Sequence, residues 1–333
     1  MGDTMNKRKI ILDVDTGTDD AIALMAAILS DAFEIVGVTT VAGNLPLPQT
    51  TANTLRVVSL LATHIPVIRG CAQPLVRDLD PRRKFCDNEE TVVDETGHRI
   101  AFHVEEFASL PPTTLQPSGQ NAVCWLVETI KNSPEKITLV LVGPQTNFAT
   151  ALRADESIVT NIEQIVIMGG GFDERNSSSS AEFNFFMDPE AAQIVLNCGA
   201  DITLIPLDAT HHAVLSMEDV QEMRSWNTIV GNFVADITEE RIKAYNTFQP
   251  LFKPDSASMH DALCVLYLLN PAVITKSELF RVDVVTGGGV CDGQSIIDAR
   301  PTAKKRKNCL VCLRTDDELF SRMLLDLLRR ANF

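Results

Sequence analysis

The sequence predicts an open, mostly parallel α/β sheet that helices cover on both faces. Short runs of apolar and β-branched residues alternate along the chain with segments that are apolar at helical spacing. Regular alternation of this kind is typical of parallel strands joined by crossover helices. The alternation contains no internal repeat, so we predict one domain over residues 1–333.

The predicted strands share short, β-branched runs and cover residues 9–15, 34–43, 65–70, 136–143, 164–171, 201–210, 280–287 and 308–315. The predicted helices between them cover residues 19–30, 50–63, 121–132, 147–154 and 188–197. Residues 78–115 and 216–259 do not follow the alternation. Because long excursions in compact domains tend to be lids or binding loops, we expect both segments to be insertions over the site, the second largely helical.

Composition and charge exclude several classes of protein. The net charge of −15 argues against binding to nucleic acid or to an anionic membrane surface. No apolar segment approaches the roughly 20 residues that span a bilayer, and the N-terminus lacks a signal-peptide core, so we expect a cytoplasmic protein. The basic run at residues 304–307 is expected to be a solvated turn. The eight cysteines are spread singly and are expected to be reduced, buried thiols.

The segment ILDVDTGTDD, residues 11–20, places four aspartates where the first strand meets the first helix. Helix capping and the helix dipole explain two of them, and Gly17 is expected to permit the tight turn. Asp13 and Asp15 fall on one strand face, where crowded carboxylates have raised pKa values or require a cation. Oxygen ligands suit Ca²⁺ or Mg²⁺, and a metal-binding carboxylate can also take a proton from water. Hydrolysis is therefore the expected reaction class.

Polar residues also follow other strands of the predicted sheet. Gly43 and Asn44 follow the second strand, residues 142–145 the fourth and residues 168–171 the fifth. Ligands of parallel sheets bind beyond the carboxyl ends of the strands, so we expect these loops and the aspartates to form one crevice.

Two later segments carry further candidate residues. His260 and Asp261 stand at the start of an apolar helix, where Asp261 alone would be an ordinary first-turn residue and His260 could donate a proton near neutral pH. The segment NSSSSAEFNFFMDPEAA contains Asn176, Glu182 and Asn184 among phenylalanines. This segment is either a serine-rich loop before a helix or part of a binding site.

Taken together, these motifs resemble the nucleoside hydrolase family, the inosine-uridine-preferring nucleoside N-ribohydrolases. DVDTGTDD is similar to the family's Asp-x-Asp-x-Gly-x-Asp-Asp signature, and VAGN, VGPQTN, MGGG, AEFNFFMDPEAA and HDAL follow in the family's order over residues 13–263. The resemblance implies a Rossmann-like sheet and Ca²⁺-dependent hydrolysis of the N-glycosidic bond of a ribonucleoside. It also implies a homodimer or homotetramer, with Ca²⁺ favoured over Mg²⁺.

The resemblance implies a role for each matching residue. Asp15 would be the general base and a Ca²⁺ ligand, and His260 would be the general acid for the leaving base. The other metal ligands would be Asp20, Asp261 and the backbone carbonyl of Val142. The ribose would be held by Asp19, Asn44, Met168, Asn176, Glu182, Phe183 and Asn184. Asp13 would support Asp15 from behind.

The resemblance is weakest where the base should bind. Family members carry a histidine in the loop after the third strand, which His98 approximates, unless Arg82, Arg83 and Lys84 form a different lid. Further base-binding candidates are Arg241, Tyr245 and Phe248, for which ordinary packing is the alternative. Cationic and histidine donors would suit a 6-oxopurine, so we expect inosine and guanosine as substrates in purine salvage. A pyrimidine-specific or broad-specificity hydrolase is the alternative.

Two other classes of protein share part of the pattern. Phosphatases of the haloacid-dehalogenase type also place two aspartates at a strand end and use Mg²⁺. Their Asp-x-Asp-Gly-Thr order differs from Thr16-Gly17 here and leaves Asp19 and Asp20 without a role. A non-catalytic nucleoside-binding protein could keep the metal site but would need neither Asp15 as a base nor His260 as an acid.

Overall fold

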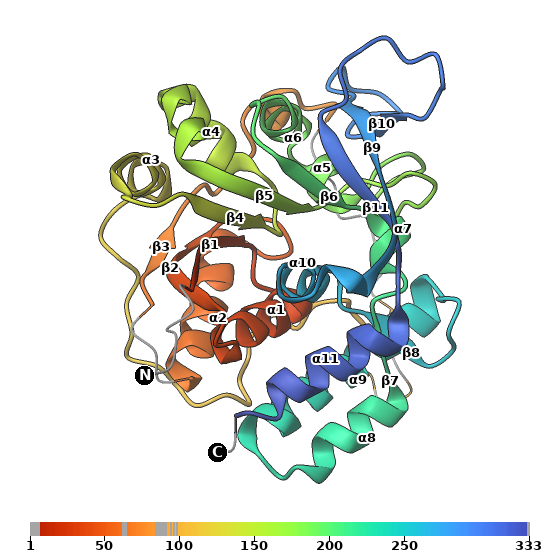
Figure 1. The fold of residues 1–333 in the computed structure, drawn as a ribbon. Helices are drawn as coiled ribbons and strands as arrows, with labels where there is room; N and C mark the ends of the chain where they lie inside the picture. The colour runs from red at the N-terminus through yellow and green to blue at the C-terminus, as the bar shows by residue number, and fades with distance from the viewer. Residues whose placement is uncertain are drawn as a thin grey trace.

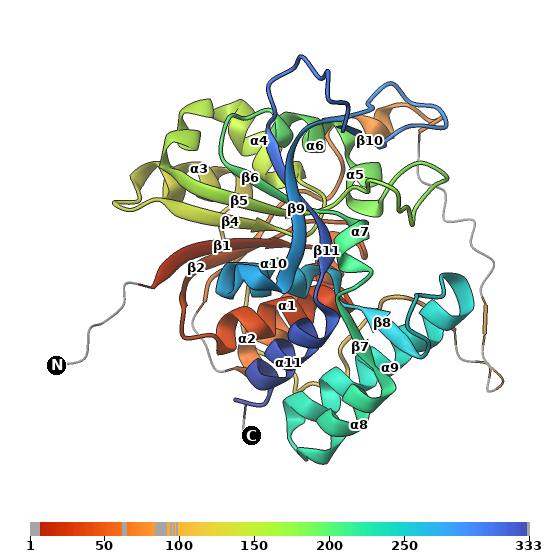
Figure 2. The ribbon, with the colours of Figure 1, turned by 45° about the vertical axis from the view of Figure 1, so that its right-hand side comes forward.

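The computed structural model describes residues 7–61, 65–83, 92–93, 95, 97 and 99–331. Within these residues a nine-stranded sheet crosses the middle of the molecule in the order β10-β9-β11-β6-β5-β4-β1-β2-β3 (Figures 1 and 2). All neighbours from β3 to β11 are parallel, whereas β9 runs antiparallel to β10 and β11. The predicted open, mostly parallel α/β fold is therefore confirmed.

The strands of the large sheet are β1 (Arg8–Val14), β2 (Phe33–Thr40), β3 (Val67–Arg69), β4 (Ile137–Leu141), β5 (Ile162–Met168), β6 (Ile202–Ile205), β9 (Ile274–Val284), β10 (Ser295–Asp298) and β11 (Cys309–Thr315). A separate hairpin pairs β7 (Val214–Ser216) with β8 (Ser256–Ser258). The helices are α1 (Thr18–Leu29), α2 (Leu47–Leu60), α3 (Ala122–Asn132), α4 (Thr146–Ala154), α5 (Phe183–Met187), α6 (Pro189–Leu196), α7 (Leu207–Thr210), α8 (Met217–Ser225), α9 (Ile229–Phe248), α10 (His260–Leu269) and α11 (Asp317–Leu328). The eight predicted strands and five predicted helices are all present, and the strands and α-helices that the sequence does not predict are β7, β8, β10, α5, α7 and α11.

Two predicted strands differ from the observed ones by five residues or more at one end. One is β9, which begins at Ile274 instead of residue 280. The other is β6, which the pattern predicts over residues 201–210 but which stops at Ile205. Pro206 follows, and a proline has no N–H group to donate to a neighbouring strand. Residues Leu207–Thr210 form the short helix α7 instead. This helix carries Thr210 to the site described below.

The side chains of β1 alternate between two cores. Ile10, Leu12 and Val14 belong to the core that contains α1, α2, α10 and α11, whereas Ile11 belongs to the core that contains α3, α4 and α6. In Figure 1 these two groups of helices lie below and above the sheet. Burial on both faces explains why the strand is almost continuously apolar up to its carboxyl end.

The insertions lie where the chain leaves the regular alternation. The second, over residues 216–259, consists mainly of α8 and α9, as predicted, and α9 packs against β8 and α1. The described part of the first contains the end of a 3₁₀ turn, η1 (Arg77–Leu79), and an isolated bridge between Val93 and Arg99. Further along, the backbone carbonyls of Glu105 and Phe107 accept hydrogen bonds from Asn53 and Arg56 of α2.

The surface predictions are confirmed in part. Residues 304–307 lie exposed between β10 and β11, as expected. The cysteines that the structure describes are free, but Cys124 and Cys291 are exposed, so the expectation of buried thiols is wrong for these two. Across the described chain, no helix has the length and apolar character needed to cross a membrane.

Candidate active site

Asp15 lies just past the end of β1, enclosed by the loops that follow β2 and β4. Its Oδ2 atom accepts a hydrogen bond of 2.7 Å from the backbone N–H of Asn44. A Cβ atom at Gly43 would lie 2.1 Å from Asp15 Oδ2, and one at Gly143 would lie 2.7 Å from Oδ1. Any side chain at these two positions would therefore occupy the space of the carboxylate. Three strand ends thus close around one acidic group.

Asp20 stabilises the turn between β1 and α1. Its Oδ1 accepts from the backbone N–H of Asp15 at 3.0 Å, and its Oδ2 accepts from Gly17 N at 3.0 Å and from Asn44 Nδ2 at 3.1 Å. The φ angle of Gly17 is −101°, which other residues also adopt, so the turn itself does not require glycine. A Cβ atom there would lie 2.2 Å from His103 Nδ1, so glycine is needed to admit this histidine.

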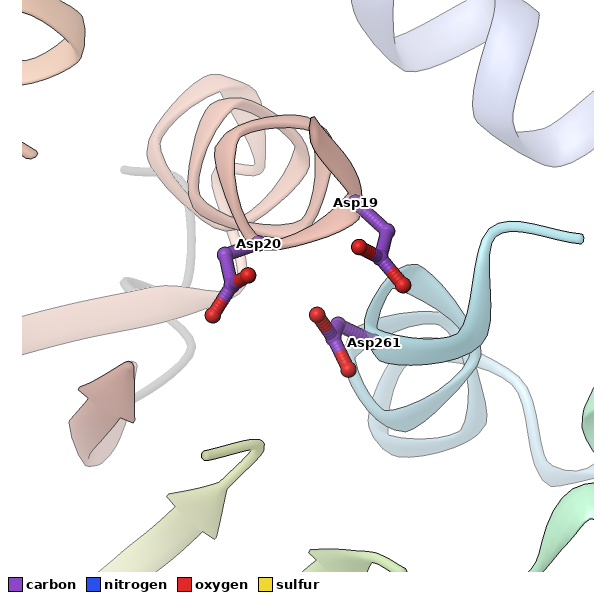
Figure 3. Close-up of side chains that lie close together, drawn as sticks. All are labelled: Asp19, Asp20 and Asp261. Carbon is purple, nitrogen blue, oxygen red and sulfur yellow. The ribbon is translucent and has the colours of Figure 1, made fainter. Parts of the chain in front are cut away.

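Three carboxylates gather between the first turns of α1 and α10, which pack side by side (Figure 3). One oxygen each of Asp19, Asp20 and Asp261 lies within 4.8 Å of the other two. Burial raises the pKa of Asp20, and burial together with the charges of Asp19, Asp20 and Asp15 raises the pKa of Asp261 well above its ordinary value. Burial and the neighbouring Asp20 likewise raise the pKa of Asp15.

This group of oxygen atoms fits a hard divalent cation. Asp15 Oδ1 and Asp19 Oδ1 are buried and have no hydrogen-bond partner among the described residues. Buried carboxylates crowded in this way need a compensating positive charge, and an oxygen-only donor set suits Ca²⁺ or Mg²⁺ better than a transition metal. The group of three carboxylates includes Asp19, to which the family resemblance assigns ribose binding. Asp19 therefore lies close to the candidate metal site as well as to the expected position of the ribose.

Asp13 does not belong to the group of Asp19, Asp20 and Asp261, and its carboxylate links neighbouring segments at the strand ends. Its Oδ1 accepts hydrogen bonds from Thr39 Oγ1 at 2.5 Å and from Asn147 Nδ2 at 2.7 Å. Asn147 of α4 also donates to the carbonyl of Thr40 and accepts from the backbone N–H of Cys71. Burial raises the pKa of Asp13 to about 7. Through these contacts Asp13 and Asn147 link the ends of β1, β2 and α4.

The segment around α5 forms another wall of the site. Glu182 caps α5 by accepting hydrogen bonds from the backbone N–H groups of Asn184 and Phe185. It also accepts from the backbone N–H of Gly170 in the loop after β5, and burial raises its pKa to about 7. The side-chain amide of Asn184 donates to the carbonyl of Val142 at 2.7 Å and to that of Met168 at 3.2 Å. Asn184 thereby joins the strand ends of β4 and β5.

Many of these residues border one cavity of about 1140 Å³, whereas Asp13, Asp15 and Asp20 are not among the residues that line it. Thirteen of the predicted site residues line it, namely Asp19, Asn44, Val142, Met168, Asn176, Glu182, Phe183, Asn184, Arg241, Tyr245, Phe248, His260 and Asp261. The structure therefore brings residues from widely separated parts of the chain to one hollow, as the strand-end argument predicts.

His260 is hydrogen-bonded at both ring nitrogens. Nε2 lies 2.6 Å from the hydroxyl of Tyr245, and Nδ1 lies 2.7 Å from Thr210 Oγ1 and 3.1 Å from Ser258 Oγ. Burial, followed by the nearby Arg241, lowers the pKa of His260 well below its ordinary value, and burial raises the pKa of Tyr245 to about 12. The sequence points to His260 and Tyr245 but gives no signal for Thr210.

Among the described residues, the loop histidine that lines the cavity is His103, which no sequence motif singles out. His103 Nδ1 accepts a hydrogen bond from the backbone N–H of Thr18 at 3.2 Å and lies 3.7 Å from Asp19 Oδ1. The predicted candidate, His98, lies outside the described residues, as does Lys84. Two histidines five positions apart in an aperiodic loop cannot be ranked from sequence.

The arginines predicted near the base bind protein groups. Arg82 pairs with Asp80, and Arg83 pairs with Asp292 and Glu190. Neither arginine is among the residues that line the cavity. Arg241 does line it, but its guanidinium donates to Asp19 Oδ2 at 2.8 Å and to two backbone carbonyls.

Comparison with known proteins decides the family. The sequence model of the inosine-uridine preferring nucleoside hydrolases matches residues 10–322. The chain belongs to this family. It is 36% identical over 316 residues to the pyrimidine-specific ribonucleoside hydrolase RihB of Escherichia coli O9:H4 (strain HS), covering 95% of both chains. The RihB protein of strain K12 / DH10B is 34% identical with the same coverage.

Solved nucleoside hydrolases share the fold. The purine-preferring ribonucleoside hydrolase from Gardnerella vaginalis has a TM-score of 0.81 and 27% identity, over 98% of this chain and 99% of that one. An inosine-guanosine nucleoside hydrolase has a TM-score of 0.80 and 26% identity, over 97% and 99%. This nucleoside hydrolase is therefore an enzyme that acts on N-glycosyl bonds, and the phosphatase and non-catalytic alternatives fall away.

Proposed function

We propose that this nucleoside hydrolase is a Ca²⁺-dependent enzyme that releases ribose and free base from purine ribonucleosides, with inosine and guanosine as preferred substrates in purine salvage. The observation that carries the base preference is the chain from Thr210 through His260 to the Tyr245 hydroxyl at the edge of the cavity. For this relay His260 must first carry a proton on both ring nitrogens: its Nε2 proton replaces the one that Tyr245 gives to the departing base, and a neutral imidazole remains. Because burial lowers the pKa of His260, this doubly protonated form is a minor one near neutral pH. A purine that accepts the proton from Tyr245 leaves as a neutral molecule.

The cation would be held by Asp15, Asp20, Asp261 and the carbonyl of Val142. When bound, it would lower the pKa of a water molecule and orient it towards the sugar. Asp15 would take the proton from that water through Oδ1, which is buried and has no partner among the described side chains. Mg²⁺ is less suited than Ca²⁺, because ligands from two helices, a strand end and a loop form an irregular set of oxygens.

The remaining cavity residues would hold the ribose. Asp19, Asn44 and Asn184 would bind the 2′- and 3′-hydroxyl groups, while Asn176 and Glu182 would bind the 5′-hydroxyl beside Phe183 and Met168. Nearby carboxylates stabilise the positive charge that develops on the sugar as the base departs. Gripping three hydroxyl groups allows binding energy to favour the transition state over the bound substrate.

Tyr245 and Phe248 would contact the base, since both line the cavity from α9. His98 remains a candidate contact. We further propose that residues 1–333 form one domain and that the enzyme is a cytoplasmic homodimer or homotetramer.

Pyrimidine specificity is the second candidate function. The two RihB proteins, named pyrimidine-specific, are 34% and 36% identical to this chain, whereas the purine-preferring enzyme from Gardnerella vaginalis is 27% identical. The cationic donors that favoured a purine are also reduced in number, because the guanidinium of Arg241 is bound to Asp19 and to backbone carbonyls.

A substrate panel tests both candidates. The purified enzyme is incubated with inosine, guanosine, uridine or cytidine, with Ca²⁺, with Mg²⁺ or with a chelator, and free ribose is measured. We expect the highest kcat/KM for inosine and guanosine, and loss of activity with the chelator that Ca²⁺ restores better than Mg²⁺. Higher kcat/KM for uridine and cytidine would establish the second candidate. Absence of ribose from every nucleoside would overturn both.

A further inference from the structure

Arg241 connects three separate parts of the molecule from a buried position. Nε donates to the carbonyl of Ser258 in β8 at 2.9 Å, Nη1 donates to the carbonyl of Phe102 at 3.1 Å, and Nη2 donates to Asp19 Oδ2 at 2.8 Å. The side chains of Arg241 and Asp19 are only 3% and 5% exposed. A guanidinium is suited to this arrangement, because its N–H groups point in fixed directions within one plane.

The ion pair leaves the two oxygens of Asp19 in different situations. Oδ2 is held by Arg241, whereas Oδ1 is buried and has no hydrogen-bond partner among the described residues. Asp19 lines the cavity, so Oδ1 is the oxygen available to a ligand. Without the guanidinium, the carboxylate could rotate and would be a buried charge without its arginine partner.

The same arginine also holds the loop segment at Phe102, which lines the cavity. The carbonyl it binds belongs to Phe102, whose ring packs against Tyr245 at 5.1 Å and Phe248 at 5.7 Å between ring centroids. The next residue, His103, accepts a hydrogen bond from the backbone N–H of Thr18. The side chain of Arg241 thus fixes the position of the loop at Phe102 relative to the Asp19 carboxylate.

We propose that Arg241 is a positioning residue for recognition of the sugar: it holds one oxygen of Asp19 so that the other accepts a hydrogen bond from a ribose hydroxyl. By binding the Phe102 carbonyl, it also keeps the adjacent loop against the cavity. Arg241 therefore acts on the sugar through Asp19 and not by contact with the base. This inference rests on the proposed function, because it requires a ribonucleoside as the substrate.

The test compares sugars. The Arg241→Met variant keeps a side chain of similar reach without donors, and Arg241→Lys restores one charged donor. Both are assayed with inosine and uridine and with the 2′-deoxy and 3′-deoxy forms of each. Where turnover of a deoxynucleoside is too slow to follow, its inhibition constant against nitrophenyl riboside replaces kcat/KM. Arg224→Met is the matched control, because Arg224 also forms ion pairs with carboxylates of α9, Asp236 and Glu239, but on the surface.

In Arg241→Met, kcat/KM for the ribonucleosides is expected to fall about tenfold or more, as for loss of a charge-assisted hydrogen bond. The loss should be much smaller for the deoxynucleoside that lacks the hydroxyl bound by Asp19. Arg241→Lys should recover part of the loss, and Arg224→Met should behave as the wild type. Backbone amides of residues 99–105 should exchange hydrogen faster in Arg241→Met.

An equal loss with all three sugars would show that Arg241 only maintains the fold and would overturn the inference. If Arg241→Met does not fold, Arg241→Lys and Arg241→Gln carry the same comparison. Failure of the proposed function would appear differently, as absence of ribose release by the wild-type enzyme.

Discussion

The hydroxyl of Tyr245 lies 2.6 Å from Nε2 of His260 at the edge of the cavity. Tyr245→Phe removes this hydroxyl and keeps the ring that packs on Phe102. General acid catalysis typically contributes about 10²- to 10⁴-fold, so we expect kcat/KM for inosine to fall by about 100-fold. Nitrophenyl riboside, whose leaving group needs no proton, should be hydrolysed almost as fast as by the wild type.

The chain offers a matched control for this prediction. Tyr267 is the only other tyrosine in the sequence, and its hydroxyl lies near Thr203 and outside the cavity lining. Tyr267→Phe should therefore leave kcat/KM unchanged for both inosine and nitrophenyl riboside. If Tyr245→Phe slows inosine and nitrophenyl riboside by the same factor, the hydroxyl has no role in protonating the base.

Asp15→Asn should nearly abolish turnover of every nucleoside, because the amide can neither take a proton from water nor supply a negative charge to a cation. Steady-state assays at saturating Ca²⁺ measure this loss. Asp13→Asn is the comparison variant, since the Asp13 carboxylate is hydrogen-bonded to Thr39 and Asn147 and is not one of the proposed metal ligands. Its effect on kcat should be clearly smaller. Retention of substantial activity by Asp15→Asn would remove Asp15 from the role of base.

Gly43→Ala should inactivate the enzyme, because the new Cβ atom would lie 2.1 Å from Asp15 Oδ2 and must displace either the carboxylate or the loop. Gly119→Ala and Gly287→Ala are the controls, since a Cβ atom at either position meets nothing within 4 Å. Activity assays together with thermal melting separate a displaced carboxylate from a destabilised fold. Normal activity of Gly43→Ala would show that the loop has room to move.

Stability should depend on pH and on Ca²⁺ in a linked way. Burial raises the pKa of Asp13 from 3.8 to about 7 and also raises the pKa values of Asp15, Asp20 and Asp261. Groups with a raised pKa in the folded state stabilise it fully below the ordinary value of 3.8, and this contribution is lost as the pH rises towards 7. The metal-free protein should therefore lose stability over this range.

Added Ca²⁺ should oppose that loss, because it binds the ionised carboxylates and competes with protons. The increase in Tm caused by Ca²⁺ is therefore expected to be larger at about pH 8 than at about pH 5. Thermal melts with Ca²⁺ and with a chelator provide the measurement, and Asp261→Asn should reduce the increase. An increase that is independent of pH would argue against binding by these carboxylates.

The sequence predicts the centre of the site better than its rim. Asn44, Val142 and Met168 could be placed because each lies at or just past the end of an apolar strand, and the ends of parallel strands meet at one edge of the sheet. Thr210 could not be placed, because the sequence pattern predicts one strand over residues 201–210. In the structure the strand ends before Pro206, and Thr210 lies in the helix α7. The ion pair between Arg241 and Asp19 joins residues more than two hundred positions apart, and only the folded chain reveals it.

His103 illustrates why the loop could not be predicted in detail. The segment around it has neither helical nor strand periodicity, so nothing in the sequence fixes which side chain turns inwards. Its place depends on Gly17, which leaves space for the imidazole beside α1. Such close approaches between distant segments have no local signature.

The placement of β1 between β2 and β4 has a consequence for engineering this enzyme. Asp15 directly follows a strand that is paired on both sides, whereas Tyr245, Phe248 and Phe102 come from α9 and an irregular loop. Exchanging residues on α9 and in this loop leaves the backbone pairing of β1 intact. Libraries confined to these two segments, with Arg241 and Tyr245 kept, are therefore the natural route to new base preferences with the hydrolytic centre unchanged.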